Sequence, residues 1–197
     1  MIFKKAIYLL LIPFLIVSGQ EYSFHKATGL FMSVGVGPRA PVGDFSENQN
    51  IGIGADFSMS YTNSDFLPVF FYANVGFMNF PGKQTFYKNS DYSSLTTNVI
   101  LLNGGVKYFW PPLIEDIFLL MPFIEAGASA GYFEKGHVFK IDSNKRNFTE
   151  NNIKTGFQVG GGFSMFMMDV QVSYNYFHNN QFLAFNLRVR IPIFVEF

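Results

Sequence analysis

The sequence contains no cysteine. This absence excludes disulfide bonds, thiolate metal sites, a cysteine nucleophile and a lipid-modified cysteine after a leader. Charged residues are also scarce, at 14% of the chain against roughly 25% in an ordinary soluble domain. The formal net charge is +0, so the chain has no basic footprint for nucleic acid. Aromatic residues instead reach 19%, and a water-facing surface of normal polarity is difficult to build from such a composition.

Long apolar runs are missing after the first 19 residues. Lys4 and Lys5 precede an apolar run at 6–17, and small residues follow it, which is typical of a secretory signal peptide. The run is shorter than the roughly 18 to 20 residues that a helix needs to cross hydrocarbon, which argues against a membrane anchor. We therefore expect a signal peptide at residues 1–19 and one domain at residues 20–197. If the mature chain lives in a membrane, it must do so as a closed barrel.

Hydrophobicity with a period of two is the main pattern that is present. In the closing stretch RVRIPIFVEF, apolar side chains stand at every second position back from Phe197, and Arg188 and Arg190 fall in the other register. This period indicates a strand with two unlike faces. It recurs in seven further runs, and no helical period competes with it. The expected strands are residues 30–37, 51–61, 69–80, 97–110, 124–132, 156–165, 170–176 and 183–197.

Long polar loops and short turns alternate between these runs. This rhythm is typical of an outer-membrane barrel, with loops outside the cell and turns in the periplasm. A soluble lipocalin-like barrel is the alternative, since it also has eight strands but turns its bulky apolar face inward.

The placement of charge favours the membrane barrel. Few charged residues lie in the expected strands, namely Asp56, Lys107, Glu125, Lys154, Arg188, Arg190 and Glu196. The polar register is mostly Gly, Ser, Asn and Gln, which suits a crowded interior, whereas the apolar register would be tolerated by lipid but not by water. We therefore predict an all-β fold, an eight-stranded antiparallel up-and-down transmembrane β-barrel, in the cell outer membrane.

Three stretches carry a resemblance to a known family. GLFMSVGVGPRAPVGDFSENQNIGIGADFSMSY, PFIEAGASAGYF and the aromatic C-terminus resemble the small outer-membrane β-barrel domain family, which includes OmpA-, OmpX- and OmpW-like proteins. The resemblance covers nearly all of the mature chain and implies the same fold and location. In that family the closing strand is the tag that the barrel-insertion machinery recognises. The resemblance therefore implies an insertion signal at Phe197, Val195 and Ile193.

Five charged residues in the polar register form the candidate lumen network: Asp56, Lys107, Glu125, Arg188 and Arg190. The interior of an eight-stranded barrel is about wide enough for side chains to fill. Charges buried there must pair, because a lone one would cost several kcal/mol. One interpretation is a salt-bridged plug. The other is a gate or constriction that selects solutes.

Glycines in the same register remove side-chain volume. They either let the strands bend around a narrow barrel or leave a cavity inside it. The glycines concerned are Gly35, Gly52, Gly54, Gly76, Gly127, Gly131, Gly156, Gly160 and Gly162.

Signals for an enzyme are faint. A barrel that hydrolyses or transfers lipid acyl chains needs a histidine with a serine and a carboxylate in reach. Of the three histidines, His178 is nearest an expected rim, but its neighbours are Asn179, Asn180 and Gln181. Paired metal-ligand spacings are absent, and no helix follows the glycine triplet at 160–162 to form a phosphate loop. We expect no catalytic residue, no cofactor and no metal.

Two of the expected loops are long and polar. Residues 81–96 and 133–152 mix aromatic and basic side chains, which could contact lipopolysaccharide phosphates or an extracellular partner, or could simply be solvated. The leading functional hypothesis is an integral outer-membrane barrel with a structural or surface-interaction role and a plugged lumen. The alternative is a narrow channel or transporter for small or hydrophobic solutes, through the lumen or a lateral opening.

Overall fold

The computed structural model describes residues 28–113 and 120–196, and strands dominate these residues. The expected signal peptide at 1–19 lies outside them. The described elements are β1 (Thr28–Val42), α2 (Phe45–Asn48), β2 (Gly52–Thr62), β3 (Val69–Pro81), α3 (Gln84–Lys88), β4 (Tyr92–Phe109), β5 (Leu120–Phe139), the 3-10 turn η1 (Ile141–Ser143), β6 (Phe148–Met165), β7 (Met168–Phe177) and β8 (Gln181–Glu196). In the described part of the chain, no helix has the length and apolar character to cross a membrane.

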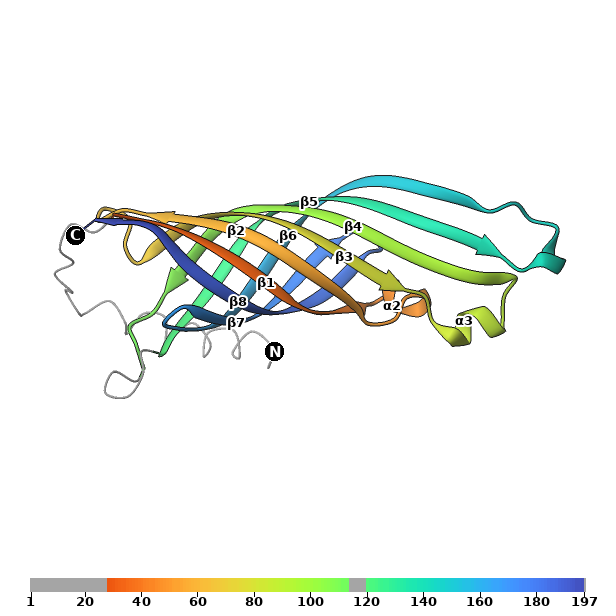
Figure 1. Cartoon of the computed structure of the whole chain (residues 1–197), viewed down its shortest axis with the longest axis horizontal. Coiled ribbons are helices and arrows are strands. Elements are labelled where there is room, and N and C mark those ends of the chain that lie inside the picture. Colours follow the sequence, from red (N-terminus) through yellow and green to blue (C-terminus); the bar gives the residue numbers. More distant parts are fainter. Residues whose placement is uncertain (1–27, 114–119, 197) are drawn as a thin grey trace, which may run out of the picture.

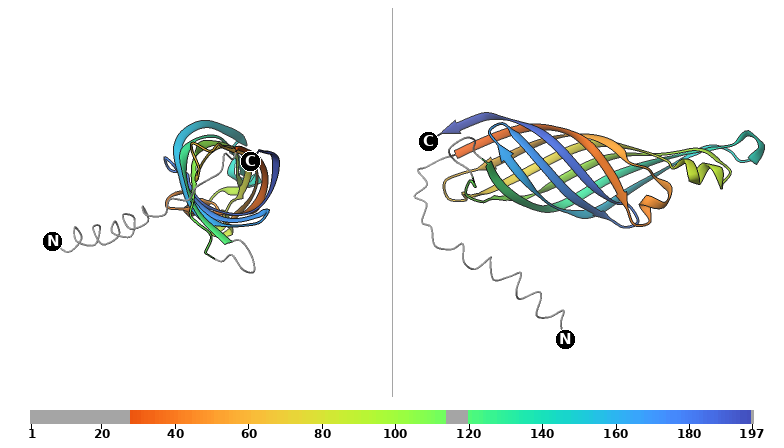
Figure 2. Two further views of the ribbon diagram at one scale, coloured as in Figure 1. Left: turned by 90° about the vertical axis from the view of Figure 1, so that its left-hand side faces the viewer. Right: turned by 90° about the horizontal axis from the view of Figure 1, so that it is seen from below.

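Each strand pairs antiparallel with the next, and β8 returns to pair with β1, so the sheet closes into a barrel (Figures 1 and 2). The predicted all-β fold with eight antiparallel strands is confirmed. Short connections join β2 to β3 and β6 to β7, at the end where β1 begins and β8 finishes. The helices α2 and α3 and the turn η1 lie at the opposite end.

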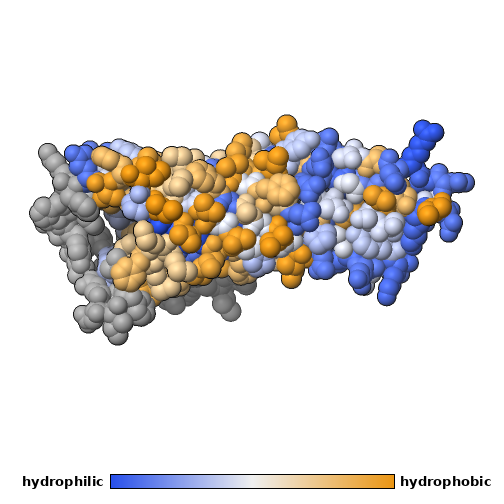
Figure 3. All heavy atoms as spheres, in the orientation of Figure 1, coloured by the Kyte–Doolittle hydropathy of each residue, from blue (hydrophilic) through white to orange (hydrophobic). Residues whose placement is uncertain are grey.

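Side chains alternate between the two faces of the wall, as a period of two requires. In β2, Asp56 and Ser58 are buried, whereas the neighbouring Phe57 and Met59 are exposed. The other strands follow the same rule over most of their length, so large apolar side chains lie on the outside of the barrel. At the start of β6 and the end of β8, successive residues are exposed instead. On the face shown in Figure 3 the apolar side chains gather over the left and middle parts of the barrel, and hydrophilic residues prevail toward the right-hand end. An ordinary soluble protein buries large apolar side chains instead.

Three strands are longer than expected. β4 begins at Tyr92, β5 continues to Phe139 and β6 begins at Phe148, so much of the expected loops 81–96 and 133–152 is strand. Beyond the last pairs with β3 and β7, these strands pair only with one another. We call this part, residues 92–95, 133–139 and 148–155, the extension. It projects past the rest of the barrel in Figure 1.

β1 also differs from the expectation. The segment after Gly37 was expected to be a loop because it holds two prolines and a glycine, but β1 continues to Val42. Both prolines are accommodated in the strand, and Arg39 is thereby placed inside the barrel, fully buried.

Candidate functional site in the barrel lumen

The lumen network has its centre at Asp56 on β2. One carboxylate oxygen accepts from Arg188 Nε at 2.9 Å and from Asn74 Nδ2 at 3.2 Å, and the other accepts from Arg39 Nη2 at 3.2 Å. Two guanidinium groups thus share one carboxylate in a buried site. Arg188 was predicted from the sequence. Arg39 was missed because its strand was taken for a loop.

Gly35 explains how Arg188 reaches Asp56. It stands on β1 directly between them, paired with Asp56 on one side and with Arg188 on the other. A Cβ on Gly35 would lie 2.5 Å from Cγ of Arg188 and 3.0 Å from Oδ1 of Asp56. Gly54 makes similar room for Arg39, since its Cβ would lie 2.8 Å from Nε. At these two positions, an arginine side chain occupies the space that the glycine leaves free.

Lys107 and Glu125 form the second group. They are direct cross-strand partners on β4 and β5, and Lys107 Nζ lies 3.3 Å from Glu125 Oε2. The amides of Gln158 and Gln171 both donate to the other carboxylate oxygen. Lys107 Nζ also lies 4.3 Å from the centre of the Phe123 ring, a cation–π contact. Inside the barrel, Lys107 and Glu125 therefore neutralise each other's charge.

Gln171 joins these two groups, because its carbonyl oxygen accepts from Arg188 while its amide donates to Glu125. Arg190 is separate. It pairs at 2.5 Å with Asp169 on β7, which was expected in a turn, and its guanidinium lies 5.1 Å from the centre of the Phe109 ring. Of the five predicted residues, Asp56, Arg188 and Glu125 are thus connected through hydrogen bonds, Lys107 joins them through its ion pair with Glu125, and Arg190 has its own partner.

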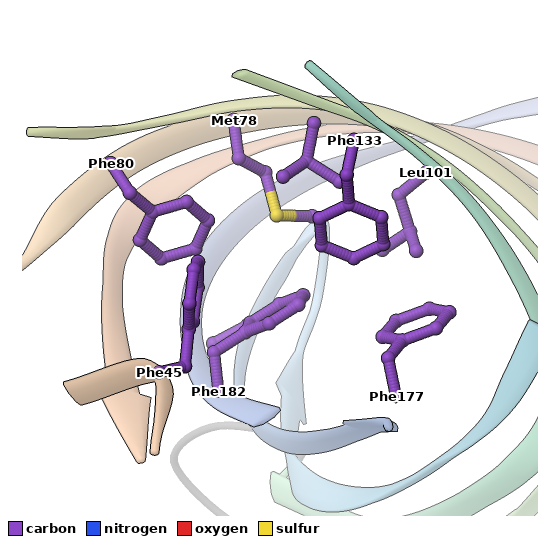
Figure 4. Close-up of a cluster of buried hydrophobic side chains, with 9 residues drawn as sticks. Phe45, Met78, Phe80, Leu101, Phe133, Phe177 and Phe182 are labelled. Atoms are coloured by element: carbon purple, nitrogen blue, oxygen red, sulfur yellow. The ribbon is translucent and has the colours of Figure 1, made fainter. Parts of the chain in front are cut away.

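The upper part of the lumen, toward α2, is apolar rather than polar. Nine buried residues form one cluster there: Phe45, Met78, Phe80, Val99, Leu101, Phe133, Phe177, Phe182 and Ala184. Figure 4 shows the rings of Phe45, Phe80 and Phe182 turned toward one another, with Phe133 and Phe177 beside them. Phe45 comes from α2 in the connection after β1, and its ring packs edge-on against Phe80 at 4.9 Å between centroids.

The sequence carried one trace of this cluster. Val99 and Leu101 break the polar alternation of β4, and both are buried inside the barrel. The expectation that the inward register is mostly small and polar is therefore wrong for this half of the lumen. Period-two analysis assigns each residue to a face, but it cannot show that inward residues of several strands gather at one level.

Between the two layers lies a cavity of about 10 Å³. Arg39, Arg188 and Asn103 are among the residues that line it. Its volume is close to that of one water-sized sphere. Among the described residues, the glycines of the inward register thus leave little open space here.

The expected insertion signal is only partly described. Ile193 and Val195 are about half and two-fifths exposed, in the segment of β8 that pairs with the start of β1. Phe197 lies outside the described residues. The register shifts in this segment, so that Phe194 pairs with Leu30 and Val195 with Gly29, and the strict alternation expected for the closing strand does not continue to its end.

The extension carries a second cluster that the sequence analysis did not bring together. His137 stacks on Phe148 at 4.3 Å between centroids, its Nδ1 lies 3.1 Å from Tyr92 Oη, and its Nε2 lies 3.5 Å from Glu150. Burial, followed by the charge of Lys135, lowers the pKa of His137 from its ordinary value, against the opposing effect of Glu150. These residues come from β4, β5 and β6, and the pairing register of the three strands places them side by side.

An exposed ion pair lies at the tip, between Lys145 and Asp91 at 2.7 Å. The hydrogen bond from Lys145 lowers the pKa of Asp91, and the same bond raises the pKa of Lys145. Because both groups are fully exposed, the pair contributes little to stability. In the described part of the chain, no group of three or more His, Cys, Asp or Glu could hold a metal ion.

Solved structures resemble this barrel, although its sequence stands apart. No protein-family model and no curated protein sequence matches the chain. The crystal structure of Neisserial surface protein A (NspA) is similar with a TM-score of 0.54 and 13% identity, and the match covers 85% of this chain and 99% of that one. The chain has the fold of the small eight-stranded outer-membrane β-barrels.

Two other barrels match less well. Ail, the attachment invasion locus protein of Yersinia pestis, has a TM-score of 0.47 and 11% identity over 85% of this chain and 100% of that one. The N-terminal β-barrel domain of Pseudomonas aeruginosa OprF has a TM-score of 0.43 and 11% identity, with the same coverage.

Proposed function

We propose that the protein is an integral outer-membrane barrel with a closed lumen, which holds a rigid three-stranded sheet at the cell surface for interaction with other molecules. The observation that carries the membrane assignment is the outer face, where Ile, Val, Leu, Phe and Met side chains are exposed on all eight strands. Such a circumference is tolerated by acyl chains but not by water.

A polar row marks where this apolar surface ends toward the extension. On the outer face, Asn79 Nδ2 of β3 donates to Asn98 Oδ1 of β4 at 2.7 Å, and Asn98 Nδ2 donates to Glu134 of β5 at 3.2 Å. Hydrogen-bonded amides and a carboxylate suit the headgroup level rather than the hydrocarbon. The extension then stands above that level, at the end with the longer connections, which is the cell exterior in barrels of this kind.

Paired charges and aromatic rings support closure of the lumen. The buried ion pairs fill its middle, the cluster around Phe182 fills its upper part, and the cavity between them is about 10 Å³. We therefore favour the structural and surface-interaction role over a channel. Purified protein in a planar bilayer should give no single-channel steps, and clear steps would support the alternative of a narrow channel or transporter.

Basic side chains support an anionic partner for the extension. Across 82–96 and 133–155, seven basic residues accompany four acidic ones: Lys83, Lys88, Lys135, Lys140, Lys145, Arg146 and Lys154 against Asp91, Glu134, Asp142 and Glu150. Aromatic rings lie among them, as where Lys145 Nζ stands 5.6 Å from the centre of Phe139. Lipopolysaccharide phosphates, or an anionic extracellular partner, would suit this surface.

The free edge of β6 adds a second mode of contact. Among the described residues, 148–155 have no ladder partner on the side away from β5, where only the Lys154 side chain bonds to the His178 carbonyl and the Asn180 side chain. The β5–β6 ladder runs through them without a bulge. An unpaired edge presents a row of backbone donors and acceptors to an incoming extended chain. A folded sheet that stays rigid above the membrane would display that edge at no further ordering cost.

Orientation can be tested with engineered cysteines, because the chain has none of its own. Ile141→Cys lies in η1 and Phe66→Cys in the β2–β3 connection, and both positions are exposed. A membrane-impermeant maleimide on intact cells should label the first variant and not the second, while both should react after lysis. Labelling of Phe66→Cys on intact cells would reverse the orientation, and recovery of both in the soluble fraction would refute the membrane assignment.

Partner binding is tested separately. A variant with Lys140→Gln, Lys145→Gln and Arg146→Gln should bind vesicles containing lipopolysaccharide at least about tenfold more weakly at low salt, and the difference should shrink as salt rises. The control is Asp44→Asn with Glu47→Gln, which removes charge from the neighbouring connection at the same end. Unchanged binding by the basic-residue variant would refute this contact but leave the closed barrel untouched.

Insertion through the C-terminal strand is the remaining proposal. It rests on the resemblance of the closing residues to the tag of outer-membrane barrels and on the exposed apolar side chains of Ile193 and Val195. Phe197→Ser with Ile193→Ser should slow insertion, measured as accumulation in the periplasm in the first minutes after induction. Insertion at the normal rate would show that the machinery reads another feature.

A further inference from the structure

The seam between the first and last strands is interrupted in its upper half. β1 and β8 pair up to Val36 and again from Arg39, but Gly37 and Pro38 have no partner on β8. On the other side, both residues pair with β2. Pro38 has no N–H to donate, and Gly37 approaches the Phe185 carbonyl so closely that a Cβ would not fit. A closed barrel in hydrocarbon cannot easily leave such backbone groups unbonded.

The side chain of Arg39 occupies this interruption. Its Nη1 donates to three carbonyl oxygens, those of Phe185 at 3.0 Å, Gly37 at 3.1 Å and Pro38 at 3.3 Å. Its Nη2 donates to Asn186 Oδ1 at 2.7 Å and to Asp56 at 3.2 Å. One guanidinium group thus bonds β1 to β8 where the ladder does not, and β2 holds it in place through Asp56.

The cavity of about 10 Å³ lies directly behind the same place. Arg39, Ala184 and Asn186 are among the residues that line it. In front of the interruption, Val36 and Leu187 are exposed on the outer face. At this level the backbone of Gly37 lies against the Phe185 carbonyl, and the Arg39 side chain supplies the hydrogen bonds that cross the seam on its inner side.

We propose that Arg39 is the latch of a lateral door between β1 and β8. When its guanidinium group leaves the seam, Gly37, Pro38, Phe185 and Asn186 separate, and the cavity opens sideways to the outer face. The geometry favours opening here because Gly37 and Pro38, between the pairs Val36–Leu187 and Arg39–Ala184, have no ladder partner on β8, and the Arg39 side chain bridges this stretch. The door goes beyond the proposed function, since a barrel closed along its axis would still have a side exit.

Hydrogen–deuterium exchange of the protein in lipid nanodiscs tests the latch. In Arg39→Met, amides at 36–40 and 183–187 should exchange at least about tenfold faster than in the wild type, and those at 100–106 of β4 should not change. Arg39→Lys should behave like Arg39→Met, because an ammonium keeps the charge for Asp56 but cannot bond three carbonyls and an amide at once.

Glycine variants give a second test that deletes no charge. In Gly54→Ala, the new Cβ would lie 2.8 Å from Arg39 Nε and would displace the guanidinium, so exchange at the seam should rise. The matched control is Gly76→Ala, also inward-facing, whose Cβ would meet nothing closer than 3.4 Å and should leave exchange unchanged. This pair keeps the proposal testable if Arg39→Met does not fold.

Lys107→Met controls for general loss of stability, since it removes a buried cation on the side of the barrel opposite the β1–β8 seam. Its exchange should rise around β4 and β5 rather than at the seam. Unchanged exchange at 36–40 and 183–187 in both Arg39→Met and Gly54→Ala would overturn the latch. An equal rise in amide exchange in all eight strands of these two variants would overturn it as well.

Discussion

The middle and the upper part of the lumen fill the same barrel by opposite means. In the middle, Asp56, Arg39 and Arg188 form a network in which every charge depends on a named partner. In the upper part, rings such as Phe80 and Phe182 pack without directional bonds. A buried charge network fails when one partner is removed, whereas an aromatic cluster can partly collapse around a gap. The two halves should therefore respond differently to single substitutions.

Removal of the central carboxylate should have the largest effect. Asp56→Ala leaves both Arg39 and Arg188 without their carboxylate, and losing one partner of a buried pair costs about 3–5 kcal/mol, so we expect about 5 kcal/mol here. Urea unfolding in lipid vesicles, followed by heat-modifiable gel mobility, measures the change in the free energy of unfolding. A loss below about 1 kcal/mol would mean that the two arginines find other partners.

Removal of one ring from the upper cluster should have a smaller effect. Phe182 is fully buried between Phe80 and Phe177. We expect Phe182→Ala to lower the free energy of unfolding by about 3 kcal/mol, the low end for such a change, because the neighbouring rings can move into the space. The same urea titration applies. If this loss exceeded that of Asp56→Ala, the contrast between the two halves would be reversed.

Overfilling the network should have a moderate effect. Gly35→Ala places a Cβ 2.5 Å from Arg188 Cγ and should lower the free energy of unfolding by about 1–2 kcal/mol, as overpacking does elsewhere. Gly76→Ala on β3 should change it little, since its Cβ has ordinary van der Waals distances. Equal losses in the two variants would show that the glycines are required for strand bending rather than for the arginines.

The extension should respond to pH with the smallest effect. Because burial lowers the pKa of His137, the folded extension favours the neutral ring. This contribution is fully present above the ordinary histidine pKa of about 6.5 and is lost as pH falls through the lowered folded value. The protection factors of the amides at 135–139 and 148–150, which correct for the intrinsic pH dependence of exchange, should therefore fall between pH 7.5 and pH 5 more than in a His137→Gln control. An equal change in the control would assign the effect to other groups.

Much of the fold followed from the sequence because one physical rule covers it. Exposed Phe57 and buried Asp56 are neighbours, and a wall between lipid and a narrow interior must alternate in this way. The sequence also indicated that Lys107 and Glu125 lie in the inward register and need partners, but only the strand register shows that they pair with each other. Asp169 was not foreseeable as a partner, because its position beside a turn gave no sign that Arg190 would reach it.

The strand at 38–42, the aromatic cluster and the extension depend on contacts between distant parts of the chain, which a local sequence pattern does not show. Pro38 and Pro41 indicated a loop, yet hydrogen bonds from the Arg39 side chain and pairing with β8 keep the segment in the wall. The aromatic cluster requires Phe45, Phe133 and Phe182 to meet from α2, β5 and β8. The sequence predicts loops for the extension because its residues are mostly polar, as in solvent-exposed loops. Only the pairing register of β5 and β6 shows that these residues form strands.

The unbroken ladder of β5 and β6 also fixes how far the protein can reach. From Glu134 at the polar row to Lys140 beside the tip is six residues, or about 20 Å of strand, and the tilt of the barrel shortens its height. If the polar row lies at the headgroup level, as we propose, the tip stands no more than about 20 Å above it. A large partner would then have to approach the membrane itself to contact the tip.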